Sequence, residues 1–218
     1  MTVAPPCRRL NERHYGALTG LSKPSLAAEL GEDVVQAFRH GLHDTPPPMD
    51  SGHAYSDVGA RKYGDLREVP STESLQNCMV RTLPLWDDKI KPDLLSGRTV
   101  MVVAHGNSLR GLVKHIDGVS DDNISRVSIP NGIPLVYKFE RSRGADLVVA
   151  PAESADGGGV LRGEFLEKKG LLRAALAAEA DLKRRIPGSN AREDTFSVRA
   201  LKKLELGVGN GRFDVAST

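Results

Sequence analysis

The strongest candidate for chemistry is a single histidine, His105, which follows a predicted buried strand. Residues 99–104 form a continuous apolar, β-branched run, and a Gly-Asn-Ser turn follows the histidine. Apolar residues at helical spacing over 109–116 then predict a helix. A strand buried on both faces, a polar turn and a helix are typical of an α/β sheet whose carboxyl edge binds anions. The alternative is a capping turn with Asn107 or Ser108 as the helix cap, and the pattern leaves both interpretations open.

A second candidate is the segment around Glu12, which combines a carboxylate with several cations. Its neighbours are Arg8, Arg9, Arg13, His14 and Tyr15. Such a cluster could supply a general acid while the arginines bind phosphate oxygens. The alternative is a solvated surface segment of mixed charge, which composition alone favours.

The triplet Arg39-His40-Gly41 matches the nucleophile signature of one phosphate-handling superfamily. That nucleophile stands at the end of a strand, whereas this triplet closes a helical pattern over residues 25–38 and leads to the prolines at 46–48. We therefore do not expect His40 to be a nucleophile.

Periodicity and turn residues predict the elements that position these candidates. Helices are expected at 25–38, from Ser71 or Thr72 to about Ile90, after His105 and at 164–185, with further strands at 133–139 and 146–150. Residues 1–150 are expected to form one α/β domain, 151–186 a glycine-containing linker and a C-terminal helix, and 187–218 a loosely held tail.

The composition narrows the class of protein. The 218 residues include 30 Lys and Arg against 28 Asp and Glu, and the net charge of +2 does not require nucleic acid or a membrane as partner. Two cysteines suit a reducing compartment, and with no secretory signal in the first ten residues we expect a cytoplasmic protein. The longest apolar runs are far shorter than a membrane span. No histidine or cysteine has the spacing of a metal ligand, so no metal is expected.

Five distinctive sequence blocks follow one another between residues 8 and 139. They are 9–21 (RLNERHYGALTGL), 46–49 (PPPM), 73–75 (ESL), 104–115 (AHGNSLRGLVKH) and 129–137 (IPNGIPLVY). In this order and spacing they closely resemble the cofactor-dependent phosphoglycerate mutases of the histidine phosphatase superfamily. Several long motifs in register make the resemblance specific.

The resemblance implies a three-layer α/β fold and an isomerase of glycolysis. Such enzymes interconvert 2- and 3-phosphoglycerate through a phosphohistidine, primed by 2,3-bisphosphoglycerate and without a metal. By position, Glu12 resembles the acid/base carboxylate and His105 the second active-site histidine, which hydrogen-bonds the transferring phosphoryl group. The positions that resemble substrate-binding residues are Arg13, Tyr15, Lys23, Arg39, Gly106 and Asn107. The expected partner is thus a small phosphorylated molecule, and a homo-oligomer is compatible with the resemblance.

The chain departs from the family at its beginning. In the family, a first strand ending in Arg-His-Gly-Glu-Ser supplies the phosphorylated histidine and precedes the segment that matches residues 12–16. We expect this strand, and with it the nucleophile, to be missing here, and His40 stands where a second arginine is usual. Two alternatives follow: a catalytically inactive relative that binds phosphorylated ligands, and a phosphatase of the same superfamily, which the mutase-like blocks disfavour.

Overall fold

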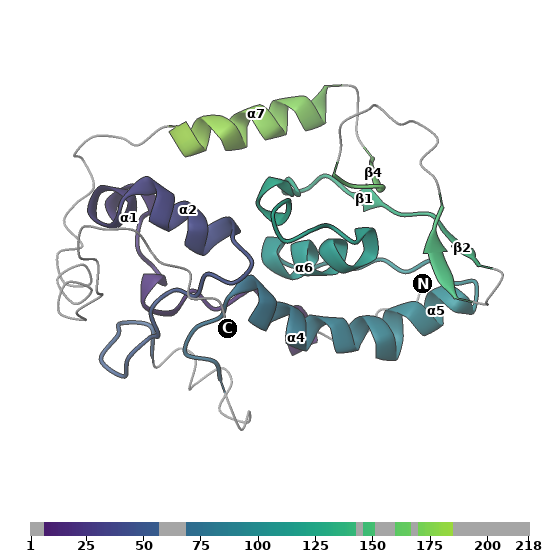
Figure 1. Ribbon diagram of the computed structural model, residues 1–218, viewed down its shortest axis with the longest axis horizontal. Helices are drawn as coiled ribbons and strands as arrows, with labels where there is room; N and C mark the ends of the chain where they lie inside the picture. Colours follow the sequence, from purple (N-terminus) through teal and green to yellow (C-terminus); the bar gives the residue numbers. More distant parts are fainter. Residues whose placement is uncertain (1–6, 57–68, 143–145, 151–159, 167–169, 185–218) are drawn as a thin grey trace.

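The computed structural model describes residues 7–56, 69–142, 146–150, 160–166 and 170–184. Helices dominate these residues and two small antiparallel sheets accompany them, so the described part is mixed α/β (Figure 1). The predicted tail at 187–218 and the linker glycines at 157–159 lie outside the described residues.

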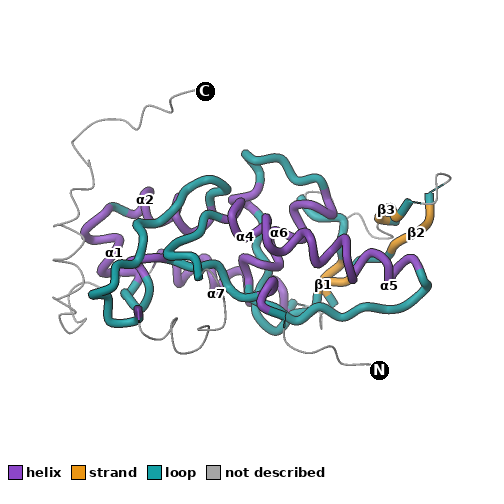
Figure 2. Tube along the Cα trace, turned by 90° about the horizontal axis from the view of Figure 1, so that it is seen from below, coloured by secondary structure: helices purple, strands orange, loops and turns teal. Residues whose placement is uncertain are grey.

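The described helices are arranged along one elongated body. α4 (Leu75–Leu85) packs on α6 (Gly106–Asp117) in the middle, and α1 (Lys23–Leu30) pairs with α2 (Glu32–His40) at one end. Figure 2 shows α1 and α2 at the end opposite the strands β2 (Phe139–Arg141) and β3 (Leu147–Val149).

The prediction of one continuous helix at 25–38 is wrong, because the structure has two helices there. Ser22 caps α1 by accepting a hydrogen bond from the backbone N–H of Ser25 at 3.2 Å. Gly31 then separates α1 from α2 with φ of 87° and ψ of 147°, a conformation that favours glycine. The apolar residues of both helices still pack into one core, since Leu26 and Val35 are buried in the same cluster.

The helix predicted from Ser71 or Thr72 begins later, at Leu75. The Ser74 side chain accepts from the N–H of Asn77 at 3.1 Å, and the Asn77 side chain accepts from the N–H of Ser74 at 3.0 Å. This reciprocal capping box fixes the start of α4 three residues beyond the Ser-Thr pair.

The same helix also runs further than Ile90. Pro84 lies inside α4, a π-helical turn (η3, Trp86–Ile90) follows, and α5 (Lys91–Leu95) continues the rod. A proline withholds one N–H from the helical ladder, and a π turn is a common local adjustment. The turn brings Trp86 and Ile90 into a buried cluster with Leu112 of α6.

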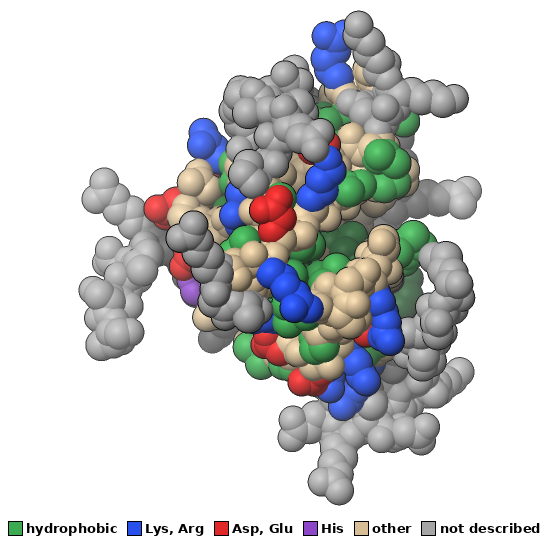
Figure 3. Space-filling model, turned by 90° about the vertical axis from the view of Figure 1, so that its right-hand side faces the viewer, with side chains coloured by type: hydrophobic (Ala, Val, Ile, Leu, Met, Phe, Trp, Pro, Cys, Tyr) green, Lys and Arg blue, Asp and Glu red, His purple; other side chains and the backbone are tan. Residues whose placement is uncertain are grey.

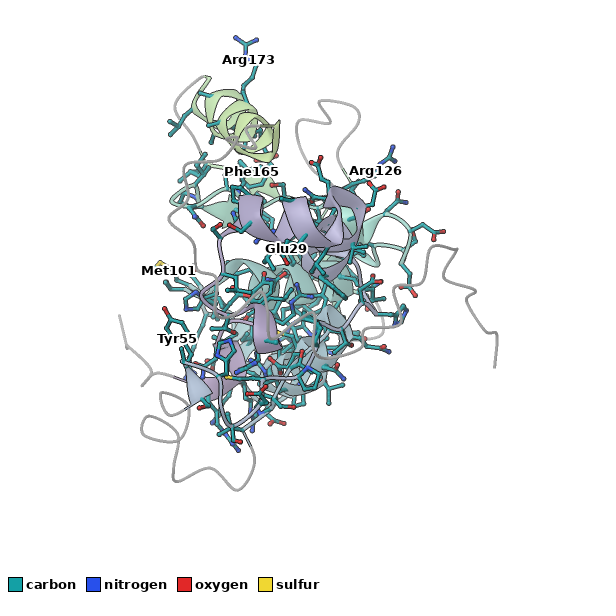
Figure 4. The ribbon with its side chains drawn as sticks, turned by 90° about the vertical axis from the view of Figure 1, so that its left-hand side faces the viewer. Glu29, Tyr55, Met101, Arg126, Phe165 and Arg173 are labelled. Atoms are coloured by element: carbon teal, nitrogen blue, oxygen red, sulfur yellow. The ribbon has the colours of Figure 1, made fainter. Side chains whose placement is uncertain are left out.

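Residues 99–104, predicted as a strand buried on both faces, are extended but have no strand partner among the described residues. None of their backbone groups forms a hydrogen bond in the described part of the chain. Val100 and Val102 pack against the Trp86 cluster, whereas Met101 and Val103 are 69% and 77% exposed. Figure 4 shows the Met101 side chain pointing away from the body of the molecule. The alternation is that of a strand with one buried face, and the prediction of two buried faces is wrong.

The described strands are short and antiparallel. β1 (Leu135–Val136) pairs with β4 (Glu164–Phe165), and β2 pairs with β3. The strand predicted at 133–139 is therefore divided between two sheets, while the strand predicted at 146–150 is confirmed as β3.

The helix predicted from Glu164 is wrong at its start. Residues 164–165 form β4, and α7 (Leu171–Arg184) begins only after Gly170, whose φ is 93°. Pairing with β1 decides this segment, because a tertiary contact outweighs local helix propensity. The segment is also tied to α6, since the nearly buried Asp117 carboxylate accepts from Tyr137 Oη at 2.7 Å and Arg162 Nε at 3.1 Å.

Three buried apolar clusters hold the described elements together. Their central residues are Leu75, Val113 and Ile124 in the first, Leu18, Leu26 and Val35 in the second, and Trp86, Ile90 and Leu112 in the third. Figure 3 views the end that bears β2 and shows hydrophobic side chains gathered around a hollow, with lysines and arginines on the raised parts. α6 contributes to two of the three clusters, so its N-terminal turn has a fixed support.

Candidate active site

The N-terminus of α6 is joined to the segment around Glu12 across about 95 residues of chain. His105 occupies the N-cap position and makes no side-chain capping bond, so neither Asn107 nor Ser108 acts as the cap. The Ser108 hydroxyl instead donates to the backbone oxygen of Asn11 at 2.5 Å. The two candidate segments of the sequence therefore lie together and form one candidate site.

The two oxygens of the Glu12 carboxylate differ in their contacts. Oε1 accepts from Asn107 Nδ2 at 2.6 Å and from the Arg13 N–H at 2.9 Å. Oε2 has only longer contacts, with the Asn107 N–H at 3.5 Å and His105 Nδ1 at 4.0 Å. Because the side chain is 30% exposed, Oε2 is the oxygen that can reach a ligand and exchange a proton with it.

Tyr15 lies beside this carboxylate. Its phenolic oxygen accepts from Asn107 Nδ2 at 2.8 Å, which leaves its O–H to donate. The next residue, Gly16, has φ of 57°, and a Cβ there would stand 2.0 Å from the backbone oxygen of Pro47. The turn that places Tyr15 therefore requires glycine.

An ion pair between the half-buried Arg81 and the buried Glu73 holds the backbone of this segment. Arg81 donates to Glu73 through Nε at 2.7 Å and through Nη2 at 2.9 Å. Nη2 also donates to the backbone oxygen of Glu12 at 3.1 Å, and the N–H of His14 donates to Glu73 at 2.9 Å. The position of Glu12 is thus set by α4, which carries Arg81.

His14 is half-buried next to the site. Burial lowers the pKa of its imidazole, and the nearby His53 lowers it too, whereas Glu73 acts in the opposite direction. Its Nδ1 accepts from the N–H of Gly16 at 3.0 Å, which requires that nitrogen to be unprotonated. His14 therefore supports the Gly16 turn in its neutral form.

Two buried arginines lie behind these side chains. Arg13 is 2% exposed and Arg110 is 6% exposed, and neither forms an ion pair within the described part of the chain. Arg13 donates through Nη2 to the backbone oxygen of Phe38, while its Nε and Nη1 have no hydrogen-bond partner there. Its guanidinium carbon stands 4.7 Å from the centre of the Tyr15 ring. Burial, followed by the charge of Arg13, lowers the pKa of Arg110 to about 10. This positive charge, which no ion pair in the described part of the chain neutralises, favours an anion.

The other predicted site residues differ in how closely they approach Glu12. Gly106 is the first residue of α6, and a Cβ there would meet nothing within 4 Å. The backbone oxygen of Arg39 accepts from both Arg13 and Arg110, so the end of α2 borders the site. Lys23 begins α1 and is exposed, and the hydrogen bonds around Glu12 do not include it.

Sequence reasoning missed the three residues that brace the site, which are Glu73, Arg81 and Arg110. A signal existed for Arg110, because it lies one helical turn from both Asn107 and the buried Val113, on the covered face of α6. The pair of Glu73 and Arg81 has no such signal, since it joins a residue before α4 to one inside it.

None of the helices in the described part of the chain is long and apolar enough to cross a membrane. Among the described residues, no three His, Cys, Asp or Glu side chains come together as metal ligands.

The described part of the chain is mixed α/β, and comparisons with known proteins show which class of protein it resembles. No family model matches the chain. Curated relatives named 2,3-bisphosphoglycerate-dependent phosphoglycerate mutase do match it. The protein from Streptomyces griseus is 52% identical over 134 residues, which are 61% of this chain and 53% of that protein. Those from Arthrobacter and Clavibacter sepedonicus are 47% and 50% identical over 62% and 61% of this chain, and 54% and 53% of their own lengths.

The resemblance to this class of isomerase, predicted from the sequence blocks, is therefore confirmed. The chain spans about half the length of the curated relatives it matches.

Proposed function

We propose that the described residues form the substrate-binding and proton-transferring part of a phosphoglycerate mutase site, acting on 2- and 3-phosphoglycerate in glycolysis. The observation that carries this proposal is the buried Arg13 guanidinium, which has two unpartnered nitrogens and no ion pair in the described part of the chain. A buried cation without an ion-pair partner is costly, and a phosphorylated acid would offset that cost. Its neighbours Glu12, Tyr15 and Asn107 supply the remaining polar groups.

The contacts of Glu12, Tyr15 and Asn107 support the roles proposed here. Glu12 exchanges a proton through Oε2 with the substrate hydroxyl, and the Tyr15 O–H donates to the substrate. His105, with a side chain that is 68% exposed, and the N–H groups at Gly106 and Asn107 contact the phosphoryl group. Arg39 near the end of α2 and Lys23 at the start of α1 add positive charge at the edge of the site.

A second phosphorylated acid fits the same charges. 2,3-Bisphosphoglycerate would supply the phosphoryl group that primes such a site, and no metal is part of the proposal. The unpartnered donors of Arg13 and the start of α6 suit its anionic groups.

The proposal includes the lack of a nucleophilic histidine in this chain. The triplet Arg39-His40-Gly41 ends a helix, α2, and the His40 backbone oxygen is held by Arg110 at 2.9 Å. It also includes the three-layer fold, in which residues 99–104 would be a paired strand. The alternatives are an inactive relative that binds phosphorylated ligands and a superfamily phosphatase.

An assay of the purified full chain with 2-phosphoglycerate and 2,3-bisphosphoglycerate tests this proposal. We expect saturable binding of 2-phosphoglycerate without formation of 3-phosphoglycerate. Turnover by the chain alone would contradict the lack of a nucleophile, and release of inorganic phosphate would favour the phosphatase. A chain that binds neither compound would overturn the site itself.

Mass spectrometry of the native protein then separates the mutase from the inactive relative. Peptides that map upstream of Met1 and contain Arg-His-Gly would support the mutase. A native N-terminus at Met1 with binding but no turnover would support the inactive relative.

A further inference from the structure

Arg110 has every donor of its side chain occupied. Nε donates to the backbone oxygen of Val127 at 3.1 Å, and Nη2 donates to those of His40 at 2.9 Å and Ile124 at 2.7 Å. Nη1 donates to the backbone oxygen of Arg39 at 3.4 Å and to Asn107 Oδ1 at 3.1 Å. A guanidinium has five N–H groups, so none remains for a ligand.

Four of these acceptors are backbone oxygens and one is a side chain. The backbone acceptors join α2 to the segment 124–127 and explain why Arg110 is buried. The contact with Asn107 has a different consequence, because it reaches the side chain that holds Glu12 and Tyr15.

The contact decides the orientation of the Asn107 amide. A guanidinium only donates, so the amide must turn Oδ1 toward Arg110. Nδ2 then faces the other way, where its two hydrogens go to Glu12 Oε1 at 2.6 Å and Tyr15 Oη at 2.8 Å. With the amide reversed, Oδ1 would face the Glu12 carboxylate and Nδ2 would face the guanidinium, two repulsive pairings.

We infer that Arg110 is a positioning residue, which acts through the Asn107 amide to hold the Glu12 carboxylate and the Tyr15 phenol as a fixed pair. This role adds a positioning residue to the proposed function. It rests on that function in one respect, which is that Glu12 and Tyr15 act on the substrate. The pKa of about 10 leaves Arg110 charged at neutral pH, so the constraint on the amide is present under ordinary conditions.

The side-chain amide resonances of Asn107 test this inference in the ligand-free full chain. In the unmodified protein we expect the Asn107 NH₂ protons to exchange with water about tenfold more slowly than those of the exposed Asn131, since two hydrogen bonds protect them. Exchange at the rate of Asn131 would overturn the inference without any substitution.

Two substitutions separate positioning from simple structural support. Arg110→Met removes every donor, whereas Arg110→Lys keeps a charged donor for Asn107 Oδ1 but cannot replace the planar fork. We expect both to lower the melting temperature, but only Arg110→Met to lose the slow exchange of Asn107. Arg126→Met, at an exposed arginine that points outward in Figure 4, is the matched control.

The outcomes are distinct from those of the proposed function, because no ligand is added. A folded Arg110→Met variant with unchanged Asn107 exchange would overturn the inference, as would an Arg110→Lys variant that loses the slow exchange completely. If Arg110→Met does not fold, the unmodified protein and Arg110→Lys decide the question.

Discussion

Arg81 and Glu73 form a two-point ion pair whose two bonds measure 2.7 and 2.9 Å, with the Glu73 side chain only 6% exposed. The same guanidinium holds the backbone oxygens of Arg9 and Glu12, at 3.0 and 3.1 Å. The pair therefore joins the start of α4 to the segment that bears the candidate carboxylate, and it serves stability and site geometry together.

Arg81→Met should destabilise the protein by about 3 kcal/mol, because it leaves the buried Glu73 carboxylate unpaired. Arg98→Met removes a similar but exposed pair with Asp93 and should cost under about 0.5 kcal/mol. Urea unfolding of both variants measures the difference. Equal losses would show that the Glu73 pair is no stronger than a surface contact.

The pH dependence of stability should contain a contribution from His14. Its pKa is lowered from 6.5 by burial, so the unfolded chain binds more protons than the folded one just below that value. The contribution of His14 to stability is therefore fully present above its ordinary pKa and is lost as the pH falls through its lowered pKa in the folded protein. As the pH falls from about 7 to about 5, the free energy of unfolding of His14→Gln should therefore decrease less than that of the unmodified protein. Identical slopes in urea unfolding would contradict this.

Residues 99–104, which have no strand partner among the described residues, should promote self-association. Their unpaired backbone donors and acceptors, beside the exposed apolar side chains of Met101 and Val103, are a template for strand pairing. Met101→Lys with Val103→Thr should reduce concentration-dependent association, and since both side chains are largely exposed, the melting temperature should hardly change. Sedimentation velocity over a range of concentrations measures this. An unmodified protein that is monomeric throughout would refute the prediction.

The break between α1 and α2 depends on the backbone of Gly31. A Cβ there would meet nothing within 4 Å, so Gly31→Ala tests the positive φ alone, at an expected cost of about 1–3 kcal/mol. Gly118, with φ of 62° and ψ of 35° and similar open space, lies in the left-handed region that asparagine tolerates. Gly118→Asn should therefore cost clearly less in the same unfolding assay.

The local structure around the candidate site was predicted better than the strands were. The turn from His105 to Ser108 and the helix after it could be anticipated, since a polar turn and helical spacing are local signals. The association of this turn with Glu12 required the family resemblance, because 95 residues separate Glu12 from Asn107.

The errors arose where long-range contacts decide the local structure. Residues 99–104 have strong strand propensity but no partner among the described residues, and 164–165 have a helical pattern but pair with β1. The break at Gly31 and the π turn after Pro84 come from single residues within an otherwise regular helical pattern.

Calorimetric titration of 3-phosphoglycerate into the full chain tests the central claim most directly. We predict saturable binding by the unmodified protein, much weaker binding of unphosphorylated glycerate, and at least about tenfold weaker binding of 3-phosphoglycerate by Arg13→Met, with loss of a charge-assisted hydrogen bond. Arg126→Met is the control for charge, and circular dichroism confirms that each variant is folded. Equal binding of 3-phosphoglycerate by folded Arg13→Met and the unmodified protein would contradict the account.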